Sequence, residues 1–175
     1  MSNFYDRKDA KNKEKYNDYI TPHNAWDSIL HLLPKDKIIY EPFYCNGDSG
    51  DYLKEKGFNV IHKKLDFYEY ANILEYGLIL SNPPFADCKK LFNFLFELDK
   101  PFILILPTSK LHTHYLKKHL VNKKIQILVP HRRIHFIKCD EDGNKIPDWK
   151  PATCFDCFYY CYKLGLDRDI IFLDY

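Results

Sequence analysis

The stretch GLILSNPPFADCKKLFNFLFELDKPFILILP, residues 77–107, decides the fold. GLILS at 77–81 is a short apolar run of strand length. PFILILP at 101–107 is almost wholly apolar, as expected for a strand that is buried on both faces. Between them, CKKLFNFLFELDK at 88–100 is amphipathic and predicts a helix. A strand, a helix and a second strand in this order predict two parallel strands joined by a right-handed crossover.

Upstream of this unit the same alternation continues. TPHNAWDSILHLL, residues 21–33, predicts a helix with Thr21 as its N-cap. KIIYEP at 37–42 and FNVIHKK at 58–64 predict two strands, separated by the loop FYCNGDSG and a brief helix that ends at Gly57. We therefore expect a second strand–helix–strand unit in the first half of the chain.

Downstream, TSKLHTHYLKKHL at 108–120 predicts a helix and KIQILVP at 124–130 a strand. Residues 133–138 and 153–164 flank a turn-rich segment, which predicts a long hairpin. We expect an α/β fold of Rossmann-like type, a mostly parallel sheet with helices on both faces and a C-terminal antiparallel hairpin at one edge. Ligands of such sheets bind beyond the carboxyl ends of the strands.

The length and composition of the chain predict its domain organisation and its cellular compartment. The chain has 175 residues and a formal net charge of +2, which fits one domain but is too weak alone to indicate nucleic acid. Residues 1–18 are charged and lack apolar periodicity, so we expect a loose arm followed by a single domain at 19–175. With no apolar run near the roughly 20 residues of a membrane span and no signal peptide, we expect an intracellular protein, cytoplasmic or nuclear and not secreted, that does not contact a membrane.

Six cysteines invite a disulfide or metal interpretation. Cys154, Cys157 and Cys161 lie in ATCFDCFYYCYKL, which is rich in aromatic residues and has neither glycine nor proline. This pattern predicts a buried strand, in which residues three apart point to opposite faces. We therefore expect reduced, structural thiols and no metal site.

Three polar or aromatic stretches follow predicted strands. SNPPF at 81–85 ends a strand on two prolines, which fix an extended backbone and aim a carbonyl and the Asn82 amide oxygen as rigid acceptors for an amino group. EPFYCNGDSG at 41–50 is a strand–loop–helix junction of the kind that meets nucleotide-like ligands. Asp66, followed by Phe67, can accept a hydrogen bond from an adenine amine and opens an irregular or helical link. The topology of a parallel sheet brings all three stretches to one edge.

Together these motifs resemble the class I amino-methyltransferases that use S-adenosylmethionine, especially the DNA N6-adenine enzymes. The resemblance covers about residues 18–164 and rests on NPPF, with Thr-Pro opening the first helix, Glu-Pro-Phe after the first strand and Asp-Phe as supporting matches. It implies that the catalytic residues are Asn82, Pro83, Pro84 and Phe85. It implies that the cofactor-binding residues are Thr21, Pro22, Glu41, Pro42, Phe43, Gly47, Asp66, Phe67 and Ser81.

The expected activity is methyl transfer from S-adenosylmethionine to the N6 amine of adenine in DNA, with Phe85 stacking on the base. Nucleic acid is the expected partner, DNA ahead of RNA, with a partner subunit for target recognition left open. The candidate contacts are basic residues at the rims of the fold: Lys117, Lys118, Lys123, Lys124, Arg132, Arg133 and those of the N-terminal arm. The alternatives are methylation of RNA adenosine, methylation of a protein glutamine amide, and a non-catalytic subunit of the same fold that binds nucleic acid or a partner.

Two departures from the family pattern concern the cofactor. Tyr44 and Cys45 stand where small residues usually occur, and crowd the approach to the methionine moiety. The second strand ends in His62-Lys63-Lys64 rather than in an acid for the ribose hydroxyls. The link to the next strand is short, so the family's usual third strand is expected to be missing.

Overall fold

The computed structural model describes residues 19–120, 125–140, 143–147 and 156–174. The predicted arm at 1–18, the first residues of the second hairpin strand, and Cys154 lie outside the described residues.

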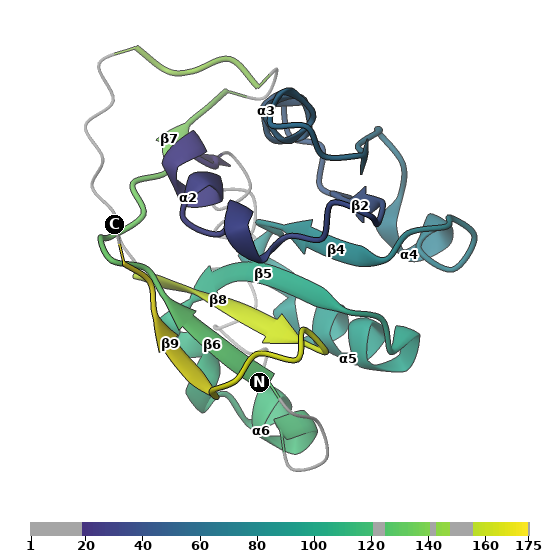
Figure 1. The fold of residues 1–175 in the computed structure, drawn as a ribbon, viewed down its shortest axis with the longest axis vertical. Helices are drawn as coiled ribbons and strands as arrows, with labels where there is room; N and C mark the ends of the chain where they lie inside the picture. The colour runs from purple at the N-terminus through teal and green to yellow at the C-terminus, as the bar shows by residue number, and fades with distance from the viewer. Residues whose placement is uncertain (1–18, 121–124, 141–142, 148–155, 175) are drawn as a thin grey trace, which may run out of the picture.

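A seven-stranded mixed sheet forms the centre of the molecule (Figure 1). Every neighbouring pair is parallel except at β8, which runs antiparallel to both of its neighbours. In spatial order the strands are β3 (Val60–Ile61), β2 (Ile39–Tyr40), β4 (Leu78–Ser81), β5 (Phe102–Pro107), β8 (Cys157–Tyr162), β6 (Ile125–Val129) and β9 (Ile170–Phe172). The prediction of a mostly parallel α/β sheet is confirmed.

Helices cover both faces of this sheet. One face packs against α2 (His23–Asp27), the 3-10 turn η1 (Leu30–Leu32) and α3 (Asp48–Glu55). The other packs against α4 (Phe67–Tyr70), α5 (Cys88–Leu98) and α6 (His114–Leu120). Two more 3-10 turns, η2 (Phe85–Asp87) and η3 (Thr108–His112), follow β4 and β5. Two apolar cores result, one on each side of the sheet.

The β4–α5–β5 unit forms as predicted from its pattern. Every residue of β4 and β5 is buried, as expected for central strands covered on both faces. Helix α5 buries Leu91, Phe92, Leu95 and Phe96, which recur at helical spacing and face the sheet. Burial of these side chains fixes the end of β4, and with it the start of the NPPF tetrapeptide.

The predicted C-terminal hairpin is wrong. Its first strand, β7 (Ile137–Lys138), pairs instead with β1 (Tyr19–Ile20) in a separate two-stranded sheet. Its second strand, β8, lies between β5 and β6 and not at the edge. The reason is that β8 is apolar on both sides: Cys157, Tyr159 and Cys161 enter one core, and Tyr160 and Tyr162 enter the other. The edge is formed by β9, where Ile170 and Phe172 are exposed.

Two predicted helices are shorter than expected. The first begins at His23, with Pro22 and not Thr21 as its N-cap, and gives way to a 3-10 turn after Ile29 takes a non-helical conformation. The helix expected at 108–120 is divided at Thr113, whose backbone is extended and whose hydroxyl donates to the Lys110 carbonyl at 2.7 Å. The chain passes from β3 through α4 directly to β4, which pairs with β2, so no further strand lies in this described stretch, as its short length predicted.

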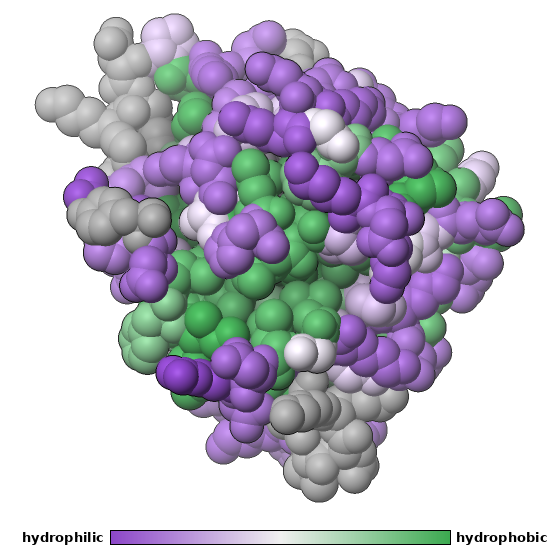
Figure 2. Space-filling model, viewed as in Figure 1, coloured by the Kyte–Doolittle hydropathy of each residue, from purple (hydrophilic) through white to green (hydrophobic). Residues whose placement is uncertain are grey.

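Apolar side chains gather on the face that carries α2, around β5, β8 and β6, with polar side chains about them (Figure 2). Leu30, Leu164, Leu166 and Ile171 are the partly buried apolar residues that border this part of the core. Within the described ranges, none of the helices has the length and apolar character needed to cross a bilayer.

We expect Leu104→Ala, in the middle of β5, to lower the free energy of unfolding by about 2–5 kcal/mol, because it leaves a cavity beneath both neighbouring strands. The matched control is Ile170→Ala in the edge strand β9, where the side chain is 57% exposed and the change is expected to stay within about 0.5 kcal/mol. Urea unfolding of both variants measures the difference. Equal losses would show that β5 is not the centre of the core.

Candidate functional site

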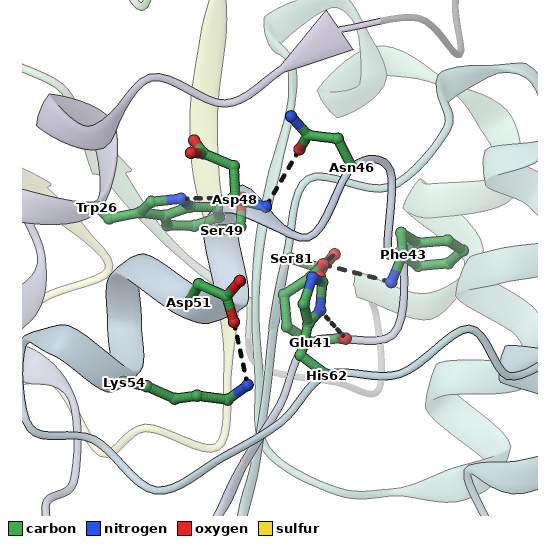
Figure 3. A network of polar contacts seen from close by, with 10 residues as sticks. All are labelled: Trp26, Glu41, Phe43, Asn46, Asp48, Ser49, Asp51, Lys54, His62 and Ser81. Atoms are coloured by element: carbon green, nitrogen blue, oxygen red, sulfur yellow. Dashed lines mark hydrogen bonds and ion pairs between the residues drawn. The ribbon is translucent and has the colours of Figure 1, made fainter. Parts of the chain in front are cut away.

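The carboxyl ends of β2, β3 and β4 meet at one edge of the sheet. Glu41 follows β2, His62 follows β3 and Ser81 ends β4. The parallel registers set Tyr40 opposite both Ile61 and Ile79, which brings these three polar residues together. Figure 3 shows Glu41, His62 and Ser81 side by side beneath the loop that carries Phe43.

The Glu41 carboxylate is the centre of this group and is almost wholly buried, at 2% exposure. The Ser81 hydroxyl donates to its Oε1, and the Phe43 backbone N–H donates to the same oxygen at 3.3 Å. His62 Nδ1 lies 2.5 Å from Oε2 and 2.9 Å from the Glu41 backbone oxygen. A buried charge requires such partners, so Glu41 joins three strand ends into one rigid support.

The electrostatic consequence falls on His62. Burial disfavours its charged form, but the hydrogen bonds and charge of Glu41 outweigh burial and raise the pKa of the His62 imidazole above its ordinary value. The pair is therefore an ion pair over a wider pH range than an isolated histidine would allow.

His62 also shapes the loop after β2. The Tyr44 ring stacks on its imidazole, with ring centroids 4.6 Å apart and planes 16° apart. On the other side, a Cβ on Gly50 would lie 2.2 Å from His62 Cδ2, so only glycine fits there. The Tyr44 ring is therefore held in place by its contact with His62.

The loop turns into α3 at Gly47, which has a left-handed backbone (φ +93°) and is the helix N-cap. Its N–H donates to the Tyr44 carbonyl at 2.8 Å, and the Asn46 side chain accepts from the Asp48 N–H at 3.1 Å. Trp26 of α2 donates to the Ser49 hydroxyl and ties the start of α3 to the neighbouring helix (Figure 3). The turn between β2 and α3 is therefore stabilised by hydrogen bonds within the protein.

An aromatic-walled pocket of about 200 Å³ opens beside this support. It is lined by Tyr19, Phe43, Tyr44, Cys45, Asn82, Pro83, Pro84, Phe85 and Phe136. The structure thus brings the whole NPPF tetrapeptide together with Phe43 of the loop after β2. Two walls come from residues that the sequence did not single out, Tyr19 of β1 and Phe136 just before β7.

Asn82 is the polar group of this pocket with an unused acceptor. Its Oδ1 is buried and accepts no hydrogen bond from any described residue. The tetrapeptide around it is held firmly, since Lys110 Nζ donates to the Phe85 carbonyl at 3.3 Å and the Cys88 thiol donates to the same oxygen. A fixed, buried acceptor beside aromatic rings suits a flat ligand that offers an N–H group.

The other predicted site residues lie outside the pocket. Glu41 and Ser81 face each other beneath it, with Pro42 buried between Glu41 and Phe43, and Gly47 is buried under the Tyr44 ring. Thr21 is buried and Pro22 caps α2. None of these other site residues lines the pocket.

Asp66 and Phe67 lie at the start of α4. Asp66 Oδ1 accepts from the backbone N–H groups of Tyr68 and Glu69 at 2.8 and 3.0 Å, which makes it the N-cap of this helix. Phe67 is buried and its ring centroid lies 5.4 Å from that of Phe43, which lines the pocket. The predicted Asp-Phe pair is therefore linked to the pocket through one layer of aromatic contact.

No protein-family model matches the chain, and the comparison with curated protein sequences found no match. The chemistry of the pocket therefore follows from its own residues.

We expect Glu41→Gln to lower the free energy of unfolding by about 3–5 kcal/mol near pH 6, because it leaves His62 buried without its counter-ion. Since the pKa of His62 is raised in the fold, the stability from the pair is full below the unfolded value of about 6.5 and is lost as pH rises through the folded value. The difference between parent and variant should therefore shrink as the pH rises above the ordinary histidine value.

Urea unfolding across this pH range measures the effect, with Asp48→Asn as the control. Asp48 pairs with His23 at 2.9 Å on the surface, where removal of the charge should change stability little. A difference between parent and Glu41→Gln that stays constant across the range would contradict the ion pair.

Proposed function

We propose that this chain is an S-adenosylmethionine-dependent methyltransferase of the class I, Rossmann-like type that methylates the N6 amine of adenine in DNA. The observation that carries the proposal is Asn82, whose buried Oδ1 has no partner among the described residues at a pocket walled by aromatic rings. A buried acceptor without a donor costs free energy, and a substrate amine that donates to it would recover that cost.

Two acceptors of the tetrapeptide orient the amine. The Asn82 amide oxygen and the Pro83 carbonyl accept its two hydrogens, which leaves the nitrogen lone pair directed away from the protein. When bound, S-adenosylmethionine supplies an electrophilic methyl group, so this chain needs no nucleophile of its own. Its residues hold the amine, and the fixed backbone of the two prolines keeps the acceptors in place.

The pocket walls favour a nucleobase over a glutamine amide as the acceptor. Five of the lining residues are aromatic, among them Phe85 and Phe136, whose rings meet edge to face with centroids 6.4 Å apart. Aromatic rings stack on flat bases regardless of the base identity, whereas an aliphatic amide gains less from them. The N6 amine of adenine combines both features, a flat ring and two N–H groups.

The residues fit the adenine end of the cofactor better than its ribose. Asp66 is exposed and caps α4 through one oxygen, and Phe67 and Phe43 supply an apolar surface beside it. At the end of β3, Lys63 and Lys64 are exposed where an acid would accept from ribose hydroxyls. This second observation is what favours the alternative of a non-catalytic subunit that binds nucleic acid.

We expect Asn82→Ala to lower the methyl-transfer rate by roughly 100-fold or more, because it removes a transition-state contact and leaves both prolines in place. Cofactor affinity should change little, since Asn82 faces the acceptor. The measurement is transfer from labelled S-adenosylmethionine to single- and double-stranded DNA, RNA and protein extract. The control is Asn59→Ala, an exposed asparagine before β3.

Full transfer by Asn82→Ala would overturn the mechanism. Transfer to RNA alone or to protein alone would replace DNA by that acceptor. No transfer by the parent, together with binding of nucleic acid, would leave the non-catalytic subunit as the function.

We expect Asp66→Ser to weaken binding of S-adenosylhomocysteine by about 1–3 kcal/mol, because it removes a charged hydrogen-bond acceptor at the proposed adenine site. Serine also caps helices, so α4 should remain intact, whereas alanine would remove both functions at once. Calorimetric titration measures affinity, and thermal unfolding checks that the fold is unchanged. Equal affinity of parent and variant would remove Asp66 from the cofactor site.

A further inference from the structure

Two thiols far apart in the sequence meet at the rim of the aromatic-walled pocket. Cys45 lies in the loop after β2 and lines the pocket. Cys139 directly follows β7, three residues after Phe136, which also lines the pocket. Their Sγ atoms are 3.9 Å apart, and the two cysteines are separated by 94 positions in the chain. Neither is in a disulfide.

The backbone around both thiols is closely packed. A Cβ on Gly143 would lie 2.6 Å from the Asn46 Cβ, so the turn that begins at Asp140 rests directly against the loop next to Cys45. That turn is closed by hydrogen bonds from the Gly143 N–H to the Asp140 carbonyl and from the Asn144 N–H to the Asp140 carboxylate. The two segments are already in contact, and a disulfide bond of about 2 Å requires mainly side-chain rotation.

The two thiols differ in access in a way that suits stepwise oxidation. Cys45 is exposed and sits at a left-handed backbone position (φ +48°), while Cys139 is 3% exposed beneath it. The remaining described cysteines, Cys88, Cys157 and Cys161, are buried in the two cores. Burial raises the pKa of the Cys157 thiol to about 12 and also raises that of Cys161, so these thiols form few reactive thiolates.

We propose that Cys45 and Cys139 are a redox modification site that forms a reversible intrachain disulfide with a hydroperoxide as the oxidant. The Cys45 thiolate attacks one peroxide oxygen and becomes a sulfenic acid, with release of hydroxide. The Cys139 sulfur then attacks the Cys45 sulfur, the S–O bond breaks and a second hydroxide leaves. In total, two thiols and one hydrogen peroxide give one disulfide and two waters.

The disulfide joins two walls of the pocket. It connects the loop of Phe43 and Tyr44 to the segment of Phe136, and all three of these residues line the pocket with Asn82. Resting on the proposed function, the inference is that oxidation slows entry of the base and lowers methyl transfer, and that reduction restores it. Disulfide formation itself does not depend on that function.

The test treats the reduced full-length protein with hydrogen peroxide, then denatures it, alkylates the thiols and maps them by mass spectrometry. We expect the number of alkylated cysteines to fall from six to four, with a Cys45–Cys139 cross-linked peptide, and to return to six after dithiothreitol. Cys45→Ser, at an exposed position, should fold normally and keep all five remaining thiols. Cys88→Ser is the control and should still form the cross-link.

Joining of Cys45 to any other cysteine, cross-links only between chains, or oxidation of Cys45 to sulfinic acid with Cys139 still alkylated would overturn the proposal. A separate arm compares methyl transfer to DNA by the oxidised and reduced protein. No transfer in either state counts against the proposed function alone, because peptide mapping still decides the disulfide. If the oxidised protein carries the cross-link and transfers methyl groups as fast as the reduced protein, the inference that the disulfide regulates methyl transfer would be overturned.

Discussion

The arrangement of the site depends on one buried charge, the Glu41 carboxylate. A carboxylate removed from water is tolerated only when its oxygens have partners, and here the partners come from the ends of two other strands and from its own loop. Glu41 therefore constrains its neighbours. Strand β3 must place His62 and β4 must place Ser81 beside the carboxylate, and residue 50 must be glycine so that the imidazole fits. Relative positions of three strands, one loop and one helix are thereby fixed at the edge of the sheet where ligands bind in such folds.

This support divides the site into two layers. Below, Glu41 contacts both His62 and Ser81, while Glu41 Oε2 and His62 Nε2 accept or donate no hydrogen bond among the described residues. Above, Phe43, Phe85 and Phe136 present apolar surface, and Asn82 presents an acceptor whose partner is missing among the described residues. The polar layer holds the end of β4 in place, and Asn82 follows it directly. The Asn82 side chain therefore loses little conformational freedom when a ligand binds, which lowers the entropy cost of binding. The small sheet of β1 and β7 completes the upper layer by placing Tyr19 and Phe136 opposite the tetrapeptide.

The sequence predicted those parts of the fold in which local pattern and burial agree. The strand, helix and strand at 77–107 were predicted correctly because an apolar run, a helical period and a second apolar run leave no other arrangement with a buried core. Prediction failed where pairing between distant segments decides: no local pattern indicates that Tyr19–Ile20 pairs with Ile137–Lys138. The central position of β8 could have been predicted from the sequence, because a strand with aromatic residues and cysteines on both faces is expected in the interior of a sheet.

The same distinction applies to the candidate site. The NPPF tetrapeptide and Phe43 could be predicted because each carries its own chemistry at a strand end, while Tyr19 and Phe136 reach the pocket only through the unforeseen pairing of β1 with β7. For Glu41 and Ser81 the sequence indicated the place, and only the structure shows that they turn inward towards each other. A short polar motif can mean a ligand contact or an internal support, and the partner that decides between them lies elsewhere in the chain.

At the end of β3, the contact between His62 and Glu41 determines which side chains remain available to a ligand. His62 is taken up by Glu41, and the next two residues are lysines, which donate hydrogen bonds but accept none. Among the described residues, the exposed side chains at this strand end, Lys63 and Lys64, therefore offer donors and no acceptors. The positive charges of Lys63 and Lys64 suit phosphate oxygens, which accept hydrogen bonds. Further along this edge, the Asp66 carboxylate supplies an acceptor, and the ring of Phe67, the next residue in the chain, lies against that of Phe43.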